Sequence, residues 1–170
     1  MGTVAVGMGF VAAVVGLATP QIGHLWSFDE LTSKADLVVI AECERTDETG
    51  LRTTHPDLNP DVPVVELATT FRIVAVLKPD RRAASAETSH VGLKHYRIDQ
   101  AEWRRQHPPE PGFPPPGLVN AGSDLDLRSD AGPYLLFLRR GPRDLYEPLS
   151  GFTFPTDSVY QMRKVGRGPG

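Results

Sequence analysis

The chain has 170 residues, of which 40% are hydrophobic and 23% are charged. This length is typical of one domain with a buried core, and the composition excludes a fully disordered protein. The formal net charge of −3 gives no overall positive field for a polyanion, so we expect no nucleic-acid partner. Sixteen glycines and sixteen prolines interrupt helices and strands, and they favour short β elements joined by turns.

Residues 1–18 are interpreted as an export signal. The run from Val4 to Ala18 has no ionisable side chain. It is shorter than the roughly 20 residues of a membrane span and typical of the hydrophobic part of a secretory signal. Gly16 and Ala18 are small enough for a signal peptidase, which predicts cleavage after Ala18. No Lys or Arg precedes the run, so a retained membrane anchor and a buried N-terminal element stay open as alternatives.

Residues 19–163 are predicted to form one β domain that begins with a short helix near residues 28–35. Ser27 and Glu30 have the spacing of a capping box, and Trp26 and Leu31 can form the flanking hydrophobic staple. A frayed tail is expected at 164–170.

The first strand is predicted from Asp36 to Arg45, followed by a turn at 46–50 and a proline-interrupted loop at 54–63. Odd positions of this strand share one face, and they hold Leu37, Val39, Ala41 and Cys43. Cys43 is the only cysteine, so it forms no intrachain disulfide. We interpret it as a packing residue, with a reactive or intermolecular thiol as the alternative.

The second strand is predicted from Val64 to Leu77, because apolar and polar residues alternate along it. One face carries Val65, Leu67, Phe71, Ile73, Ala75 and Leu77, and the other carries Glu66, Thr70 and Arg72. Beyond Arg72, Val74 and Val76 make both faces apolar, which predicts an end that is covered on both sides. A third strand is expected at Val91–Ile98.

A β-hairpin is predicted from Tyr134 to Leu149, with its turn at Gly141 and Pro142. Nothing in this hairpin is typical of a nucleophile, a base or a metal ligand. A last short helical turn is expected from Thr156 or Asp157 to Met162.

The proline-rich segment at 102–122 is predicted to be a surface loop, since six prolines fall between Pro108 and Pro116 and exclude regular structure there. Long loops in compact domains are usually functional or disordered. Aromatic and Arg side chains are enriched in interface hot spots, and this segment supplies the candidate binding residues Trp103, Arg104, Arg105, His107 and Phe113. The alternative is an insertion whose Trp103 packs back on the domain.

No motif in the sequence points to catalysis or to a metal. Five histidines are scattered without zinc spacing, and the acidic run with Asp124, Asp126 and Asp130 lacks the Gly and Glu of a calcium loop. No phosphate-binding loop or nucleophile elbow is found. We therefore predict no cofactor and no catalytic residue, with a hydrolase assembled from distant residues as the competing hypothesis.

The motifs ADLVVIAEC, TTFRIVAVLKPD, HYRI, GPYLLFLRR and YEPLSG together resemble a widespread group of exported bacterial proteins without an assigned reaction. Their strand pattern is similar to small barrels of the OB-fold and netrin-like type, and the resemblance covers roughly residues 26–162. Some netrin-like modules inhibit metalloproteinases through an N-terminal Cys and several disulfides, which this chain lacks. The resemblance implies a fold and a compartment but no activity.

Together these features predict a small antiparallel barrel of five or six strands, OB-like, with an N-terminal helix and a long Pro-rich loop. The predicted function is non-catalytic binding at the cell envelope or outside it, with an unknown protein or envelope component as partner. Membrane contact is expected only if the N-terminal segment is retained, as in a membrane-tethered accessory subunit.

Overall fold

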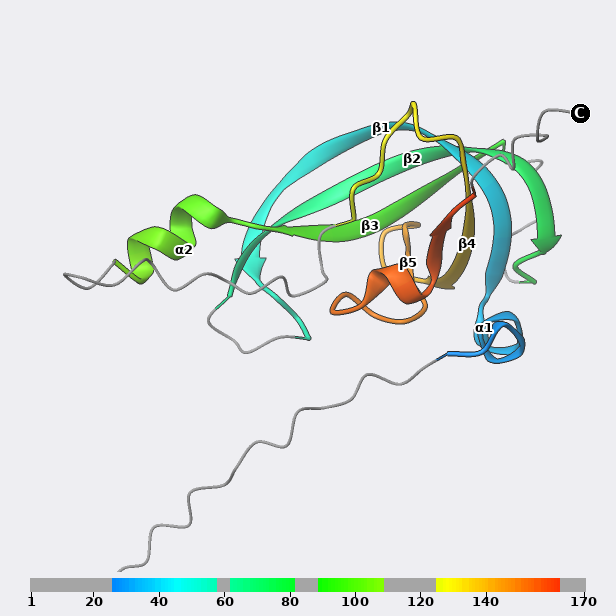
Figure 1. Ribbon diagram of the computed structural model, residues 1–170, viewed down its shortest axis with the longest axis horizontal. Helices are drawn as coiled ribbons and strands as arrows, with labels where there is room; N and C mark the ends of the chain where they lie inside the picture. The colour runs from blue at the N-terminus through cyan, green and yellow to red at the C-terminus, as the bar shows by residue number, and fades with distance from the viewer. Residues whose placement is uncertain (1–25, 58–61, 82–88, 109–124, 163–170) are drawn as a thin grey trace, which may run out of the picture.

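The computed structural model describes residues 26–57, 62–81, 89–108 and 125–162, so the predicted signal and tail lie outside the described residues. The elements in chain order (Figure 1) are α1 Phe28–Lys34, β1 Leu37–Thr54, β2 Pro63–Lys78, β3 His90–Ile98, α2 Gln100–Gln106, β4 Pro133–Arg140, β5 Tyr146–Pro148, the 3-10 helix η1 Pro155–Asp157 and β6 Val159–Gln161. The prediction of a mostly β protein is confirmed.

The strands form one sheet in the order β1-β2-β3-β5-β4-β6, and β1 also pairs with β4, so the hydrogen bonding returns to the first strand. The prediction of an all-antiparallel sheet is wrong, because β3 and β5 run parallel where Leu93 faces Tyr146. The reason is topological. A ring of β1, β2, β3, β5 and β4 has an odd number of members, and alternating directions cannot close around an odd ring.

β1 is longer than predicted, because it continues through the expected turn at 46–50 to Thr54. The polar residues of this stretch pair with β2 instead of reversing the chain. The register shifts between Cys43 and Arg45 and again between Glu48 and Arg52, and Gly50 in the second shift has a φ of 82°. A bulge with a left-handed glycine bends a strand without ending it.

The main core lies between the strands of the ring and confirms the predicted face of β1. Leu37, Val39, Ala41 and Cys43 pack there with Phe71, Leu93, Leu136 and Leu138. Phe71 is fully buried and meets the ring of Tyr134 edge-on at 5.8 Å. Burial also raises the pKa of the Cys43 thiol, which disfavours the reactive thiolate.

α1 begins as predicted, with both hydrogen bonds of the Ser27–Glu30 capping box in place. Its fully buried Leu31 packs with Val38 of β1 and Phe137 of β4, and Trp26 lies against the same cluster. The helix also contacts the end of β2. There the Nζ of Lys78 donates hydrogen bonds to three carbonyl oxygens at the end of α1, those of Thr32, Ser33 and Ala35.

β2 has the predicted extent but differs from the prediction at its end. Val74 and Val76 are 53% and 52% exposed, although both faces were expected to be covered. The pairing of β2 with β3 stops at Arg72 and His90, so this end extends beyond its neighbour. The predicted hairpin is confirmed as β4 and β5. The last segment is a correction, because η1 is followed by a strand, β6, that pairs with β4.

Candidate functional site

The candidate site lies at the end of the β1–β2–β3 sheet that carries α2 (Figure 1). The prediction of a loop starting at residue 102 is wrong for its first residues, since Gln100–Gln106 form α2. Asp99 caps this helix by accepting a hydrogen bond from the backbone N–H of Glu102 at 3.1 Å. The proline signal that indicated a loop begins only at Pro108, after the helix has ended.

Trp103 is half-buried and supports the helix. Its ring packs against a second apolar cluster made by Val62, Val64, Tyr96, Ile98 and Phe152. The ring of His107 stacks on that of Trp103 at 3.7 Å. The alternative stated from the sequence, that Trp103 packs back on the domain, therefore describes this tryptophan.

The two arginines of α2 differ in their surroundings. Arg105 forms an ion pair with Glu102 one turn away, and hydrogen bonds from Arg105 and Gln106 lower the pKa of Glu102 to about 2. Arg104 is exposed, and no ion pair or hydrogen bond of its side chain is found in the described part of the chain. Phe113, the remaining predicted contact, lies outside the described residues.

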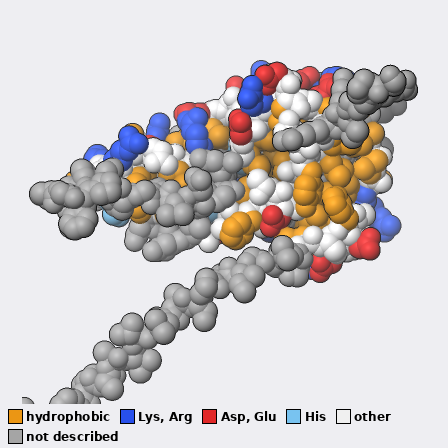
Figure 2. Space-filling model, in the orientation of Figure 1, with side chains coloured by type: hydrophobic (Ala, Val, Ile, Leu, Met, Phe, Trp, Pro, Cys, Tyr) orange, Lys and Arg blue, Asp and Glu red, His pale blue; other side chains and the backbone are white. Residues whose placement is uncertain are grey.

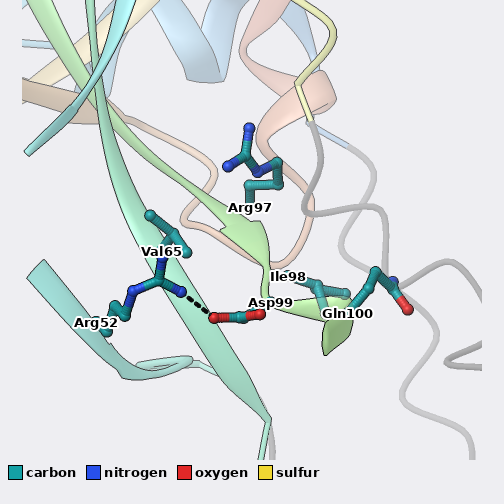
Figure 3. Close-up of a pocket in the computed structure, with 6 residues that line it drawn as sticks. All are labelled: Arg52, Val65, Arg97, Ile98, Asp99 and Gln100. Atoms are coloured by element: carbon teal, nitrogen blue, oxygen red, sulfur yellow. Dashed lines mark hydrogen bonds and ion pairs between the residues drawn. The ribbon is translucent and has the colours of Figure 1, made fainter. Parts of the chain in front are cut away.

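A groove of about 310 Å³ opens beside α2, and it is lined by Arg52, Val65, Arg97, Ile98, Asp99 and Gln100 (Figure 3). Arg52 of β1 and Arg97 of β3 both face Val65 of β2 in the strand register. Directly opposed residues in antiparallel strands share a face. The two arginines therefore flank one apolar residue across three adjacent strands.

Two ion pairs cross β2 at this groove. Arg52 of β1 pairs with Asp99, which follows β3, and Arg97 of β3 pairs with Glu48 of β1 at 2.5 Å. Figure 3 shows Arg52 directed at Asp99, while Arg97 extends away from that pair. Because the charged side chains pass over β2, they help to cover Val65 and Leu67, which are only 3% and 6% exposed.

A buried set of charges ties the hairpin to the sheet, and the sequence did not reveal it. Glu66 of β2 accepts two hydrogen bonds from Arg143, at 2.8 and 3.0 Å. Lys94 of β3 pairs with Glu147 of β5, which also binds Arg139. Alternation placed Glu66 on the polar face of its strand, but the turn of the hairpin covers that position. No local pattern signals a partner 77 residues away.

His95 lies at the centre of a second buried polar group. Its Nε2 is 2.8 Å from the Thr69 hydroxyl, which is 2.7 Å from the Thr46 hydroxyl. Its Nδ1 is buried and has no hydrogen-bond partner among the residues that the structure describes. Burial, helped by the positive charge of Arg97, lowers the pKa of His95 to about 4. The imidazole of His95 is thus neutral near pH 7, and the hydrogen-bonded hydroxyls of Thr46 and Thr69 end at its Nε2.

Metal binding finds no support in the described residues, where no group of three His, Cys, Asp or Glu is arranged to hold an ion. In the acidic run, Asp130 is engaged by Arg128 at 2.8 Å, and this contact lowers the pKa of Asp130. Asp124 lies outside the described residues. Of the helices that the structure describes, none is long and apolar enough to cross a membrane.

Comparison with known proteins gives no relative. No family model, no curated protein and no solved structure matches the chain. The candidate site is therefore interpreted from its own geometry.

Proposed function

We propose that the chain is an exported, non-catalytic binding module of the cell envelope or its surroundings, which contacts a protein or envelope component through the α2 end. The observation that carries the proposal is the groove flanked by Arg52 and Arg97, next to Arg104 of α2, which is exposed and has no side-chain partner among the described residues. The apolar run at residues 4–18 supports the export part of the proposal. The ring-like strand bonding supports a relation to OB-like and netrin-like barrels.

The groove is suited to hydrogen-bond acceptors on a partner. The side chains of Arg52 and Arg97 are 64% and 52% exposed, and each guanidinium has five N–H donors. One carboxylate partner leaves several donors open on each. Carbonyl or carboxylate oxygens of a partner chain match these donors in geometry.

Trp103 and His107 have a supporting role in this proposal. Their stacked rings hold α2 against the second cluster, which fixes the position of Arg104 relative to the groove. Arg105 and Glu102 satisfy each other on the outer face of the helix. The partner contact predicted for the proline-rich segment is thus assigned mainly to Arg104 and the groove.

The proposal is tested by crosslinking the full-length protein in native envelope extract and recovering it with its partner. We expect the same partner with the wild type and with Arg45→Glu, a charge reversal at an exposed position distant from α2 in the sequence. Arg104→Glu combined with Arg97→Gln is expected to lose that partner while keeping the unfolding midpoint. Equal recovery with all three proteins contradicts the proposed site.

A further inference from the structure

The surface at the end of the molecule that holds α1 differs in composition from the surface at the α2 end. Figure 2 shows hydrophobic side chains gathered on the half of the molecule that holds this end, whereas charged ones are frequent over the β1–β2–β3 arm. At the end of β2, Val74, Val76 and Leu77 are 53%, 52% and 57% exposed. Val74 and Val76 share one strand face and Leu77 lies on the other. Such an exposed apolar group at a strand end, beyond the last residue that pairs with β3, needs an explanation.

Aromatic and basic side chains accompany these apolar residues. Lys78 joins the end of β2 to the end of α1, so the helix is a neighbour of the strand end. Phe28, the first residue of α1, is 57% exposed and is followed by the acidic Asp29 and Glu30. At the other end of the helix, Lys34 lies 4.8 Å over the ring of Trp26. Arg81, three residues after Lys78, is also exposed. Aromatic rings and Lys or Arg around an apolar centre are the composition that favours a membrane interface.

The position of this surface in the sequence also favours a membrane as its partner. The apolar run ends at Ala18, and α1 follows after a connection that begins at residue 19 and reaches Trp26. Seven connecting residues span at most about 24 Å. A bilayer that holds the run at 4–18 therefore lies within reach of Phe28 and of the strand end beside α1.

We propose that the α1 end, comprising Phe28, Lys34, Val74, Val76 and Arg81, rests on a lipid bilayer to which the N-terminal apolar run is attached. The α2 end lies at the far side of the molecule (Figure 1). This orientation directs the groove of Arg52 and Arg97 away from the membrane. The inference is independent of the proposed partner, because it concerns the opposite end of the molecule.

The test uses the full chain carrying a nitroxide spin label at Val76→Cys, with Leu51→Cys as the matched control. Leu51 is another exposed apolar strand residue, at 43%, and it lies near the α2 end of β1. The native Cys43 is 5% exposed, so the wild type serves as the blank for labelling. Proteins are reconstituted with vesicles of phosphatidylglycerol and phosphatidylethanolamine, and relaxation by oxygen and by a water-soluble nickel chelate is compared.

We expect vesicles to raise the oxygen accessibility of the label at position 76 and to lower its nickel accessibility several-fold, while the label at 51 keeps its value in water. The proposal is overturned if the label at 76 stays as accessible to nickel as the label at 51. That result means that the α1 end faces water or a protein. It is also overturned if both labels become protected, because the membrane then does not select one end.

Discussion

Among single residues, Glu66 and Arg143 form an ion pair whose two partners are very unequally exposed. The Glu66 side chain is 2% exposed, whereas that of Arg143 is 60% exposed. Loss of the arginine therefore strands a buried carboxylate, but loss of the carboxylate leaves an arginine that water can solvate. The two partners are unequal in what their removal costs.

Replacing Arg143 with Ala is expected to reduce the free energy of unfolding by about 2–4 kcal/mol, since it leaves Glu66 buried and unpaired. Adding Glu66→Gln to Arg143→Ala should recover part of the loss, because the neutral amide removes the stranded charge and keeps a partner for the Thr49 hydroxyl. Urea unfolding of the two variants and of the exposed control Arg45→Ala measures this. Equal stability of Arg143→Ala and the control contradicts the interpretation.

His95 makes stability depend on pH. Its folded pKa of about 4 lies below the ordinary 6.5, so the folded state resists protonation. Above pH 6.5 the imidazole is neutral in both states and costs no stability. As the pH falls from 6.5 toward 4, the unfolded state is protonated first, and the free energy of unfolding decreases by about 3 kcal/mol.

The variant His95→Gln lacks this titration and can still bond the Thr69 hydroxyl. We expect the wild type to lose more stability than the variant between pH 6.5 and 4, as measured by urea unfolding at a series of pH values. Parallel pH profiles for the two proteins are inconsistent with a neutral buried imidazole.

At the scale of elements, α1 depends on its cap. Ser27→Ala removes the hydroxyl that accepts from the N–H of Glu30, and we expect a loss of about 1 kcal/mol. Ser33→Ala is the matched control, because Ser33 lies inside the helix and its hydroxyl donates to the Glu30 carbonyl of the same turn. Alanine is the better helix former there, so thermal unfolding should show no loss. Equal losses in both variants argue against a specific cap.

Asp99 serves α2 in two ways, as the helix cap and as the ion-pair partner of Arg52. Asp99→Asn keeps a cap and loses the pair, whereas Asp99→Ala loses both. An exposed ion pair contributes at most about 1 kcal/mol and a cap about 1 kcal/mol. We therefore expect Asp99→Ala to destabilise more than Asp99→Asn in urea unfolding, and the reverse order contradicts the capping role.

The elements also show where sequence patterns fail. The capping box predicted α1 because both of its hydrogen bonds are local. The polar run 46–50 has the composition of a turn, yet it continues β1 because β2 supplies the pairing partners. The start of α2 was missed, since the proline-rich residues after Pro108 suggested a loop for the whole segment. In β1, pairing with a distant strand therefore outweighs the local turn preference of residues 46–50.

At the scale of the whole molecule, β1 passes from a protected region to an exposed one. Its residues 37–42 pair with β4 on one side, and residues 38–42 also pair with β2 on the other. Beyond Glu42, the described residues provide pairing from β2 alone. The ring and its core thus protect the first part of β1, while in the arm that carries the candidate site β1 is paired with one neighbour only among the described residues.

Hydrogen exchange measured by NMR should reflect this division. Amides of residues 37–42 are expected to exchange only through global unfolding, and those of residues 44–54 through local opening with a markedly lower free energy. Uniform protection along β1 indicates instead that the arm and the ring unfold as one unit.

Local features could be predicted from the amino-acid sequence: the mostly β composition, the start of α1, the faces of the first strand and the hairpin. Each depends on residues a few positions apart, whose periodicity and capping chemistry are visible in the chain. Three features appear only in the folded chain: the parallel pair of β3 and β5, the burial of Glu66 under Arg143 and the groove between Arg52 and Arg97. These features depend on residues distant in sequence, and their positions follow from how the ring of strands closes.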